Sequence, residues 1–454
     1  MGELVRTRQI SPVELTEAHL KQIEVWQPKI NAFVRVLHEE ARATAKVAES
    51  AVMRGEVLGP LHGVPVTVKD SFDMASLPTW CGSRFRLDHV ARKDAAAVAR
   101  MRAAGAVILG KTNTPEFLNN YETDNHLTGR TNNPWDLNRT PGGSSGGESA
   151  AIAAHCSAGG IGSDGGGSIR IPAHFCGIAG LKPTPGRCSG VGHYPPIAHP
   201  GGMLGVGGPM ARTAEDVQVL FQVLAGHDME DPFSAPVPLR APNMENLRVG
   251  LWSQMFDTPM EGETQQALAS AGGALCELGV SVDEFRPSGV DGAPEMWWFF
   301  FERVYAPFTR QMIGGREGDA HWTGTELMFR ALEEPEPTMQ DVVVNLAARD
   351  RLRTALFREM NQFPVLLTPV CATHAFLHRQ RPYDLLKMMQ PVTVFNLLGM
   401  PAMVIPFGMS SDGLPIAVQL AARAYDEELL LEVAVRMERI RGAFPPPPLG
   451  GPRT

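Results

Sequence analysis

Two glycine-rich loops that carry serine lie near the middle of the chain. The first is GGSSGG at 142–147, and the second is GGGS at 165–168. Glycine lets backbone N–H groups come close to a ligand, and a serine hydroxyl becomes a nucleophile when a base lies beside it. The loops therefore predict a site for nucleophilic chemistry. Ser168 is the favoured nucleophile because three glycines come directly before it.

Composition alone leaves other interpretations of these loops open. Glycine and serine are also typical of turns and flexible linkers, although a linker would not lead straight into the Ala-rich helix expected at 148–155. A phosphate-binding P-loop would end in Lys-Ser or Lys-Thr, which neither loop does. The segment 142–146 also matches the G-x-S-x-G motif of hydrolases with a His base, but that motif needs a preceding strand, and 133–141 is rich in turn residues.

Longer motifs around the loops resemble those of a known family. They are TPGGSSGGESAAIAAH at 140–155, SDGGGSIRIPAHFCGIAGLKPTPGR at 163–187 and GVPVTVKDSFD at 63–73. All three closely resemble motifs of the amidase signature family of serine hydrolases, and the resemblance covers nearly the whole chain. One residue departs from the pattern, because Gly165 stands where the family usually has Thr or Ile.

The resemblance assigns catalytic roles to three side chains. Ser168 would be the nucleophile, and Ser144, held in a cis peptide bond, would take its proton and pass it to Lys69. An unperturbed lysine has a pKa of about 10.4, so a base that works near pH 7 needs a pKa about three units lower. Burial at the end of the apolar strand expected at 63–70 would supply that shift. The alternative for Lys69 is a surface cation or a salt bridge to Asp70.

The resemblance also implies supporting roles for the residues around the two serines. Ser145 would orient the serine pair, and Asp164 and Arg170 would brace the second loop. An oxyanion hole stabilises the negative oxygen of an acyl-transfer intermediate. Its donors would be the backbone N–H groups of Gly165, Gly166, Gly167 and Ser168.

Elsewhere the pattern of apolar residues predicts alternating helices and strands. Ser11 and Glu14 form a capping box that starts a helix, and apolar runs at 63–70 and 106–110 are typical of buried strands. We expect an α/β fold with one large domain over residues 1–445, a mixed twisted β-sheet core covered by helices. A signature core would span about 60–220 and a variable substrate-pocket region about 286–390. A Pro/Gly-rich tail, 446–454, would follow.

Composition limits the possible partners. The chain has 454 residues and a formal net charge of −8 without a basic block, which argues against nucleic acid as a partner. Its six cysteines show no metal-ligand spacing. We find no signal peptide or membrane-spanning apolar run. The expectation is a cytoplasmic enzyme without a metal or other cofactor.

For function, we expect a serine amidase that cleaves the C–N bond of carboxamides through an acyl-enzyme. Its partners would be small-molecule aryl or alkyl amides, with carbamates (urethanes) and esters as further substrates, and it would act as a monomer or homodimer. One alternative is the amidase (glutaminase) subunit of a tRNA-dependent amidotransferase, and another is a non-catalytic binding protein on the same fold. The aromatic stretch after Glu295 favours the first hypothesis because it suggests an apolar pocket.

Large apolar side chains are concentrated at 290–335. Core packing is one explanation, because consecutive aromatic residues on a helix point all round and must be mostly buried. The functional explanation is that some of them line the substrate pocket. The candidates for that role are Trp298, Trp322 and Met328.

Overall fold

An 11-stranded mixed sheet runs through the whole molecule, with the strand order β1-β3-β2-β4-β6-β5-β10-β11-β9-β7-β8. The computed structural model describes residues 1–454 except 57, 198–200 and 449–454, so the last part of the expected tail lies outside the described residues. The strands are β1 (Phe33–Val36), β2 (Pro65–Lys69), β3 (Val107–Thr112), β4 (Gly159–Asp164), β5 (Ala179–Lys182), β6 (Val206–Ala211), β7 (Arg248–Leu251), β8 (Ser281–Glu284), β9 (Val365–Pro369), β10 (Ala402–Met409) and β11 (Pro415–Ala422). Parallel pairs join β2 to β3 and β4, and β7 to β8 and β9, whereas the other pairs are antiparallel.

Helices cover both faces of this sheet. They are α1 (Gly2–Arg6), α2 (Pro12–Ile30), α3 (His38–Arg54), α4 (Ala96–Ala103), α5 (Gly146–Ala153), α6 (Arg170–Cys176), α7 (Ala214–Leu224), α8 (Gly262–Glu277), α9 (Ala293–Trp298), α10 (Ala306–Ile313), α11 (Trp322–Leu332), α12 (Met339–Glu359), α13 (Pro382–Leu397) and α14 (Glu427–Arg441). Helix α2 begins with the predicted capping box at Ser11. The expected single-domain α/β fold with a mixed, helix-covered sheet is confirmed, while the boundaries drawn within it at 60–220 and 286–390 stay predictions.

Alternation along the strands explains why the sheet has a core on each face. In β3, Ile108 joins the cluster formed with α4, α7, α8 and α14, whereas Val107 and Leu109 join the cluster under α2, α3 and α5. In β10, Ile405 belongs to the first of these clusters, whereas Val404 belongs to the cluster around α6. Successive side chains of a strand point to opposite faces, so an uninterrupted apolar run is what a sheet buried on both faces requires.

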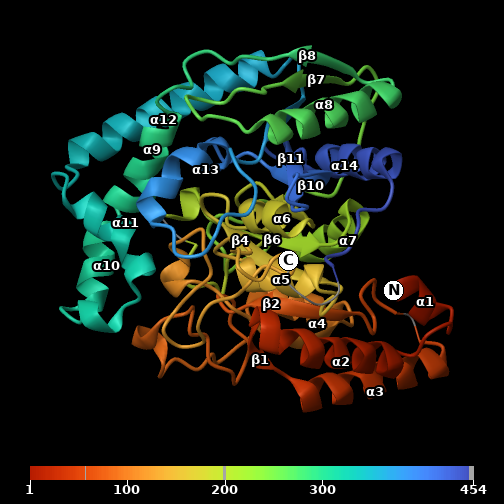
Figure 1. Ribbon diagram of the computed structural model, residues 1–454. Helices are drawn as coiled ribbons and strands as arrows, with labels where there is room; N and C mark the ends of the chain where they lie inside the picture. Colours follow the sequence, from red (N-terminus) through yellow and green to blue (C-terminus); the bar gives the residue numbers. More distant parts are fainter. Residues whose placement is uncertain (57, 198–200, 449–454) are drawn as a thin grey trace.

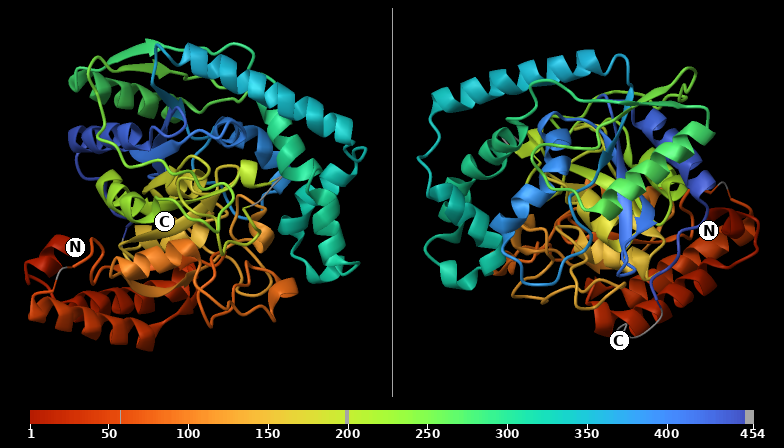
Figure 2. Two further views of the ribbon diagram at one scale, coloured as in Figure 1. Left: turned by 180° about the vertical axis from the view of Figure 1, so that it is seen from behind. Right: turned by 45° about the horizontal axis from the view of Figure 1, so that its top comes forward.

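The chain is laid out along the sheet from one end to the other. Helices α2 and α3 lie at one end, and β7, β8 and α8 lie at the opposite end (Figure 1). Helices α9, α10 and α11 form a column along one side, and α12 runs from it towards the β7–β8 end (Figure 2). No helix in the described part of the chain combines the length and apolarity needed to cross a membrane.

Strand β2 ends at Lys69, the residue predicted to stand at its exit, and all five of its residues are buried. The next residue, Asp70, pairs at 2.8 Å with Lys111 of β3, and the two side chains are only 2% and 1% exposed. The alternative of a salt bridge between Lys69 and Asp70 is therefore wrong, because Lys111 occupies that carboxylate. In the part of the chain that the structure describes, Lys69 therefore forms no ion pair with a carboxylate.

We predict that Lys111→Met lowers the free energy of unfolding by about 3–5 kcal/mol, because removing one partner leaves the buried Asp70 carboxylate uncompensated. Urea denaturation followed by circular dichroism measures the loss. Arg248→Met serves as the control, since its pair with Asp283 lies on the surface with both side chains nearly half exposed and should change little. Equal small losses in both variants would contradict a structural role for the buried pair.

Candidate active site

Lys69 lies at the bottom of the site among hydroxyl groups. Its Nζ donates hydrogen bonds to Ser144 Oγ at 2.7 Å and to Ser163 Oγ at 3.0 Å, and its side chain is fully buried. Burial lowers the pKa of Lys69 to about 7, although Cys81, Asp164 and Glu148 oppose the shift. A neutral amine is thus accessible near neutral pH, as a general base requires.

Glu148 is a further buried titratable group close to Lys69. It lies in α5 and accepts hydrogen bonds from Thr67 and, at 2.7 Å, from Thr112 Oγ1. Burial raises the pKa of Glu148 to about 7, and the hydroxyl donors and Lys69 act against that shift. Near neutral pH this carboxyl can also be uncharged, which reduces its tendency to hold Lys69 protonated.

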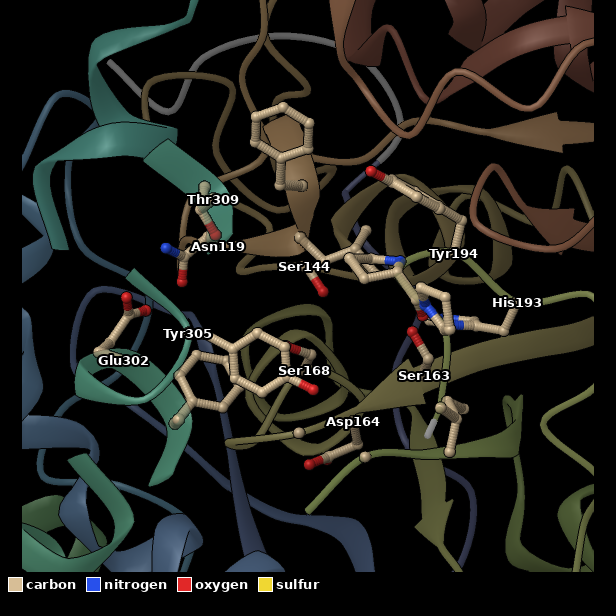
Figure 3. Close-up of a pocket in the computed structure, with 18 of the residues that line it drawn as sticks. Asn119, Ser144, Ser163, Asp164, Ser168, His193, Tyr194, Glu302, Tyr305 and Thr309 are labelled. Carbon is tan, nitrogen blue, oxygen red and sulfur yellow. The ribbon is translucent and has the colours of Figure 1, made fainter. Parts of the chain in front are cut away.

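Two loops bring the serines to the same cavity. The peptide bond between Gly143 and Ser144 is cis. The Ser145 N–H donates to the Ser168 carbonyl oxygen at 3.1 Å, which ties the first loop to the second. The Ser145 hydroxyl donates a hydrogen bond of 3.3 Å to the carbonyl oxygen of Ser163. Ser144, Ser163 and Ser168 all line one cavity of about 330 Å³ (Figure 3).

Asp164 and Arg170 are hydrogen bonded to each other and to the backbone of the second loop. Asp164 accepts from the N–H of Gly167 at 2.8 Å and of Ile169 at 3.1 Å, and it forms two hydrogen bonds with the fully buried Arg170 guanidinium. Burial alone would raise the pKa of Asp164, but the charge and hydrogen bonds of Arg170 hold it well below its usual range. The Arg170 guanidinium also donates hydrogen bonds to the side chains of Asn396 in α13 and Gln419 in β11.

The hydrogen bonds of Asp164 also reduce the number of donors in the predicted oxyanion hole. Because the Gly167 N–H donates to Asp164, it is not free to bind an oxyanion. Among the described residues, the N–H groups of Gly165, Gly166 and Ser168 have no hydrogen-bond acceptor. Three donors, rather than the four expected, therefore remain for a developing negative oxygen.

The cavity walls are mostly apolar and come from several parts of the chain, among them residues 193–197 and 205–206. Phe117 and Leu118 follow β3, and α10 with the π-helical turn Phe299–Arg303 before it supplies the aromatic side. In the segment 299–313, which contains that turn and α10, the residues that line the cavity are Phe301, Glu302, Tyr305, Phe308, Thr309 and Met312. Among the described residues that line the cavity there is no Lys or Arg.

The three predicted pocket residues lie elsewhere. Met328 is 1% exposed and packs in a separate cluster, Trp322 is 46% exposed, and Trp298 borders a different, shallower hollow beside α13. The cause is helix geometry, since only one face of each helix can point at Ser168. The predicted segment does form a wall of the cavity, but through Phe301 and its neighbours on α10.

Gly165 has a steric role that the sequence did not reveal. A Cβ atom built at Gly165 would lie 3.0 Å from the Phe301 ring. The ring of Phe301 also stacks on Trp297, with ring centroids 4.5 Å apart. Glycine, at the position where the resembling family usually has Thr or Ile, therefore makes room for an aromatic wall directly above the loop of Ser168.

Several cavity residues were missed because no motif identifies them. His193 is one of them, and burial lowers its pKa to about 3 while its Nδ1 lies 2.7 Å from the Pro195 carbonyl oxygen. Within the described residues no histidine hydrogen bonds to Ser144 or Ser168, so the hypothesis of a His base receives no support. Asn119 and Glu302 were also missed, because their approach to the serines depends on tertiary packing.

Comparisons with known proteins find relatives that are similar to this chain over almost its whole length. A family model described as Amidase matches residues 14–431. One subunit of the glutamyl-tRNA(Gln) amidotransferase of Chloroflexus aggregans is 35% identical, over 95% of this chain and 93% of the relative. The solved 6-aminohexanoate cyclic dimer hydrolase is 32% identical with a TM-score of 0.85, covering 97% of this chain and 95% of that one. A structure described as "An unexpected vestigial protein complex reveals the evolutionary origins of an s-triazine catabolic enzyme" is 29% identical with a TM-score of 0.87, covering 97% of both chains.

These relatives correct the expected partners. The curated proteins are named as subunits of a glutamyl-tRNA(Gln) amidotransferase, and such a protein belongs to an assembly. The expectation of a monomer or homodimer whose partner is a small-molecule amide or carbamate is therefore wrong. It rested on the aromatic stretch after Glu295, which reports on the wall of a cavity and carries no information about the surfaces that bind other chains.

We expect Lys69 to titrate near pH 7. NMR of the protein labelled with [ε-¹³C]lysine should show two signals that move between pH 6 and 8, because burial also lowers the pKa of Lys182 to about 7. Lys69→Met and Lys182→Met assign them. A Lys69 signal that moves only near the unperturbed value of about 10.4 would contradict the proposed base.

Proposed function

This chain belongs to the amidase family, and we propose that it hydrolyses the side-chain amide of glutamine as the amidase component of a multi-subunit amidotransferase. Ser168 would be the nucleophile, Ser144 the proton relay and Lys69 the base. The observation that carries this proposal is the hydrogen bond of 2.7 Å between Lys69 Nζ and Ser144 Oγ, in the cavity that Ser168 also lines.

Each step of the proposed reaction uses groups of this site. Neutral Lys69 accepts a proton from Ser144 as Ser144 accepts one from Ser168. The Ser168 Oγ then forms a bond to the amide carbon, and the electron pair of the carbonyl moves onto its oxygen. The N–H groups of Gly165, Gly166 and Ser168 stabilise that oxygen, each donor being worth about 3 kcal/mol in comparable sites.

The intermediate collapses when the C–N bond breaks. Lys69 returns its proton through Ser144 to the departing nitrogen, which leaves as ammonia or an amine, and the acyl group stays on Ser168 as an ester. Water then attacks this ester with the same relay and releases the acid. In an amidotransferase the ammonia would go on to a second site on partner subunits.

The names of the curated relatives support a role within an assembly, since their similarity covers almost the full length of both chains. A charge of −8 does not favour direct binding of tRNA by this chain. We therefore assign contact with tRNA to the partner subunits, and amide hydrolysis to this chain.

A second candidate is favoured by the cavity itself. Its walls are mostly apolar, and the described residues that line it include no Lys or Arg to pair with the α-carboxylate of glutamine. Apolar walls favour an aryl or alkyl amide, and a carbamate (urethane) or ester would pass through a similar tetrahedral intermediate. For this candidate, 6-aminohexanoate cyclic dimer hydrolase is the relevant structural relative.

We predict that Ser168→Ala abolishes amide hydrolysis. Ser144→Ala and Lys69→Met should each lower kcat by at least about 10³-fold, because the loss of one member of a catalytic unit costs nearly as much activity as the loss of all its members. Rates are measured with glutamine and with a chromogenic anilide. Ser149→Ala is the matched control, because the hydroxyl of this buried serine of α5 has no hydrogen-bond partner within the described residues and does not line the cavity. Near-wild-type rates in any of the three variants would refute the mechanism and favour the non-catalytic hypothesis.

The two candidates differ in what the isolated chain can do. If the chain is a glutaminase that works within a complex, ammonia release from glutamine should rise at least about tenfold when the partner subunits are present, with anilides hydrolysed poorly in both states. A coupled glutamate dehydrogenase assay measures the ammonia. Fast anilide or carbamate cleavage by the chain alone, without glutaminase activity in the complex, would instead establish the second candidate.

A further inference from the structure

The cavity contains a buried carboxyl group that the proposed mechanism does not use. Glu302 lies in the π-helical turn Phe299–Arg303, is 3% exposed and lines the same cavity as Ser168. Figure 3 shows Glu302 and Asn119 together on one side, with Ser144, Ser163 and Ser168 on the other and Tyr305 between. This end of the cavity is polar, although the surrounding walls are aromatic.

The two polar side chains at this end have unused acceptors. Glu302 Oε1 and Asn119 Oδ1 are both buried, and neither has a hydrogen-bond partner among the described residues. The Asn119 side chain forms a hydrogen bond with the Glu302 carboxyl, and this bond lowers the pKa of Glu302. The opposite effect of burial is larger and raises that pKa to about 8. Buried acceptors of this kind are normally satisfied, so these two are available to a ligand that carries hydrogen-bond donors.

The charges around Glu302 indicate which donor is missing. Within the described residues, no Lys, Arg or His forms an ion pair with Glu302, and its neighbour Arg303 pairs with Glu334 instead. With a pKa of about 8, Glu302 is mostly uncharged near neutral pH in the absence of a ligand, and an ammonium group beside it would favour its ionised form. The same ammonium group would supply N–H donors to both unused acceptors. The nearby aromatic rings, those of Phe117, Phe301 and Tyr305, also suit a cation.

We propose that Glu302 and Asn119 form an amine subsite, which binds a protonated amine on the substrate while its amide lies at Ser168. The inference rests on the proposed amide hydrolysis, and it narrows the substrate class to amides that carry a second, basic nitrogen. The α-ammonium group of glutamine meets this requirement. An ω-amino group on an otherwise apolar amide meets it equally well.

The test compares substrates that differ only in that amine. One pair is glutamine and glutaramate, which lacks the α-amino group, and the other is 6-aminohexanoyl anilide and heptanoyl anilide. For the pair that the enzyme hydrolyses, wild-type kcat/KM should be at least tenfold higher with the amine, mainly through a lower KM. In Glu302→Leu this ratio should fall to near 1, and in Glu302→Gln, which keeps an acceptor oxygen without the charge, it should be intermediate.

Glu295→Gln is the control, because Glu295 is exposed on α9 and does not line the cavity, and its ratio should match that of the wild type. Melting temperatures of all variants separate misfolding from lost recognition, and Glu302→Gln preserves size and polarity if Glu302→Leu does not fold. A wild-type ratio near 1, or one that both Glu302 variants leave unchanged, would overturn the amine subsite. Failure of the wild type to hydrolyse any amide, with or without partner subunits, would instead overturn the proposed function.

Discussion

The site depends on one hydrogen bond in a desolvated environment, that from Lys69 Nζ to Ser144 Oγ at 2.7 Å. An ammonium group buried beside a carboxylate stays charged, whereas one buried among hydroxyls loses much of the stabilisation of its charge. The fold provides the second situation, because Asp70 pairs with Lys111 and Asp164 pairs with Arg170. Asp70 and Asp164 are thus held by other cations, and burial raises the pKa of the third nearby carboxyl, that of Glu148, to about 7. Lys69 is left with serine partners and a pKa of about 7.

A second buried ion pair shapes the loop of Ser168. Asp164 stands at the end of β4 and binds Arg170 at the start of α6, and it fixes the intervening glycines through the Gly167 N–H. That contact uses one donor of the glycine run and leaves the donors of Gly165, Gly166 and Ser168 facing no acceptor among the described residues. Because Arg170 also reaches Asn396 and Gln419, the loop is anchored to the far part of the sheet. Loop geometry and core stability are therefore coupled at this ion pair.

Much of this arrangement could be predicted from sequence, for identifiable reasons. Strand β2 and the Ala-rich helix α5 follow from apolar patterning and local propensity, and the motifs around Ser144 and Ser168 are long enough to indicate the family. The cavity wall could not be predicted, because whether Phe301 or Trp322 faces the serines depends on how α10 and α11 pack and not on their composition. The role of Gly167 was also beyond sequence, since a glycine run does not show which N–H a neighbouring carboxylate takes. Glu302 was missed for the same reason, because only the folded chain shows that its carboxyl is buried with one oxygen unpartnered among the described residues.

In the proposed mechanism a neutral Lys69 activates Ser168 through Ser144. Peptide mapping by mass spectrometry after brief reaction with an aryl fluorophosphonate tests this directly, with wild type and Lys69→Met each treated at pH 6 and pH 8. We predict one adduct, on Ser168, which forms roughly tenfold faster at pH 8 than at pH 6, because a lysine of pKa about 7 is mostly neutral only at the higher pH. In Lys69→Met the adduct should form far more slowly at both values. An adduct on Ser144, or labelling of Lys69→Met at the wild-type rate, would contradict this mechanism.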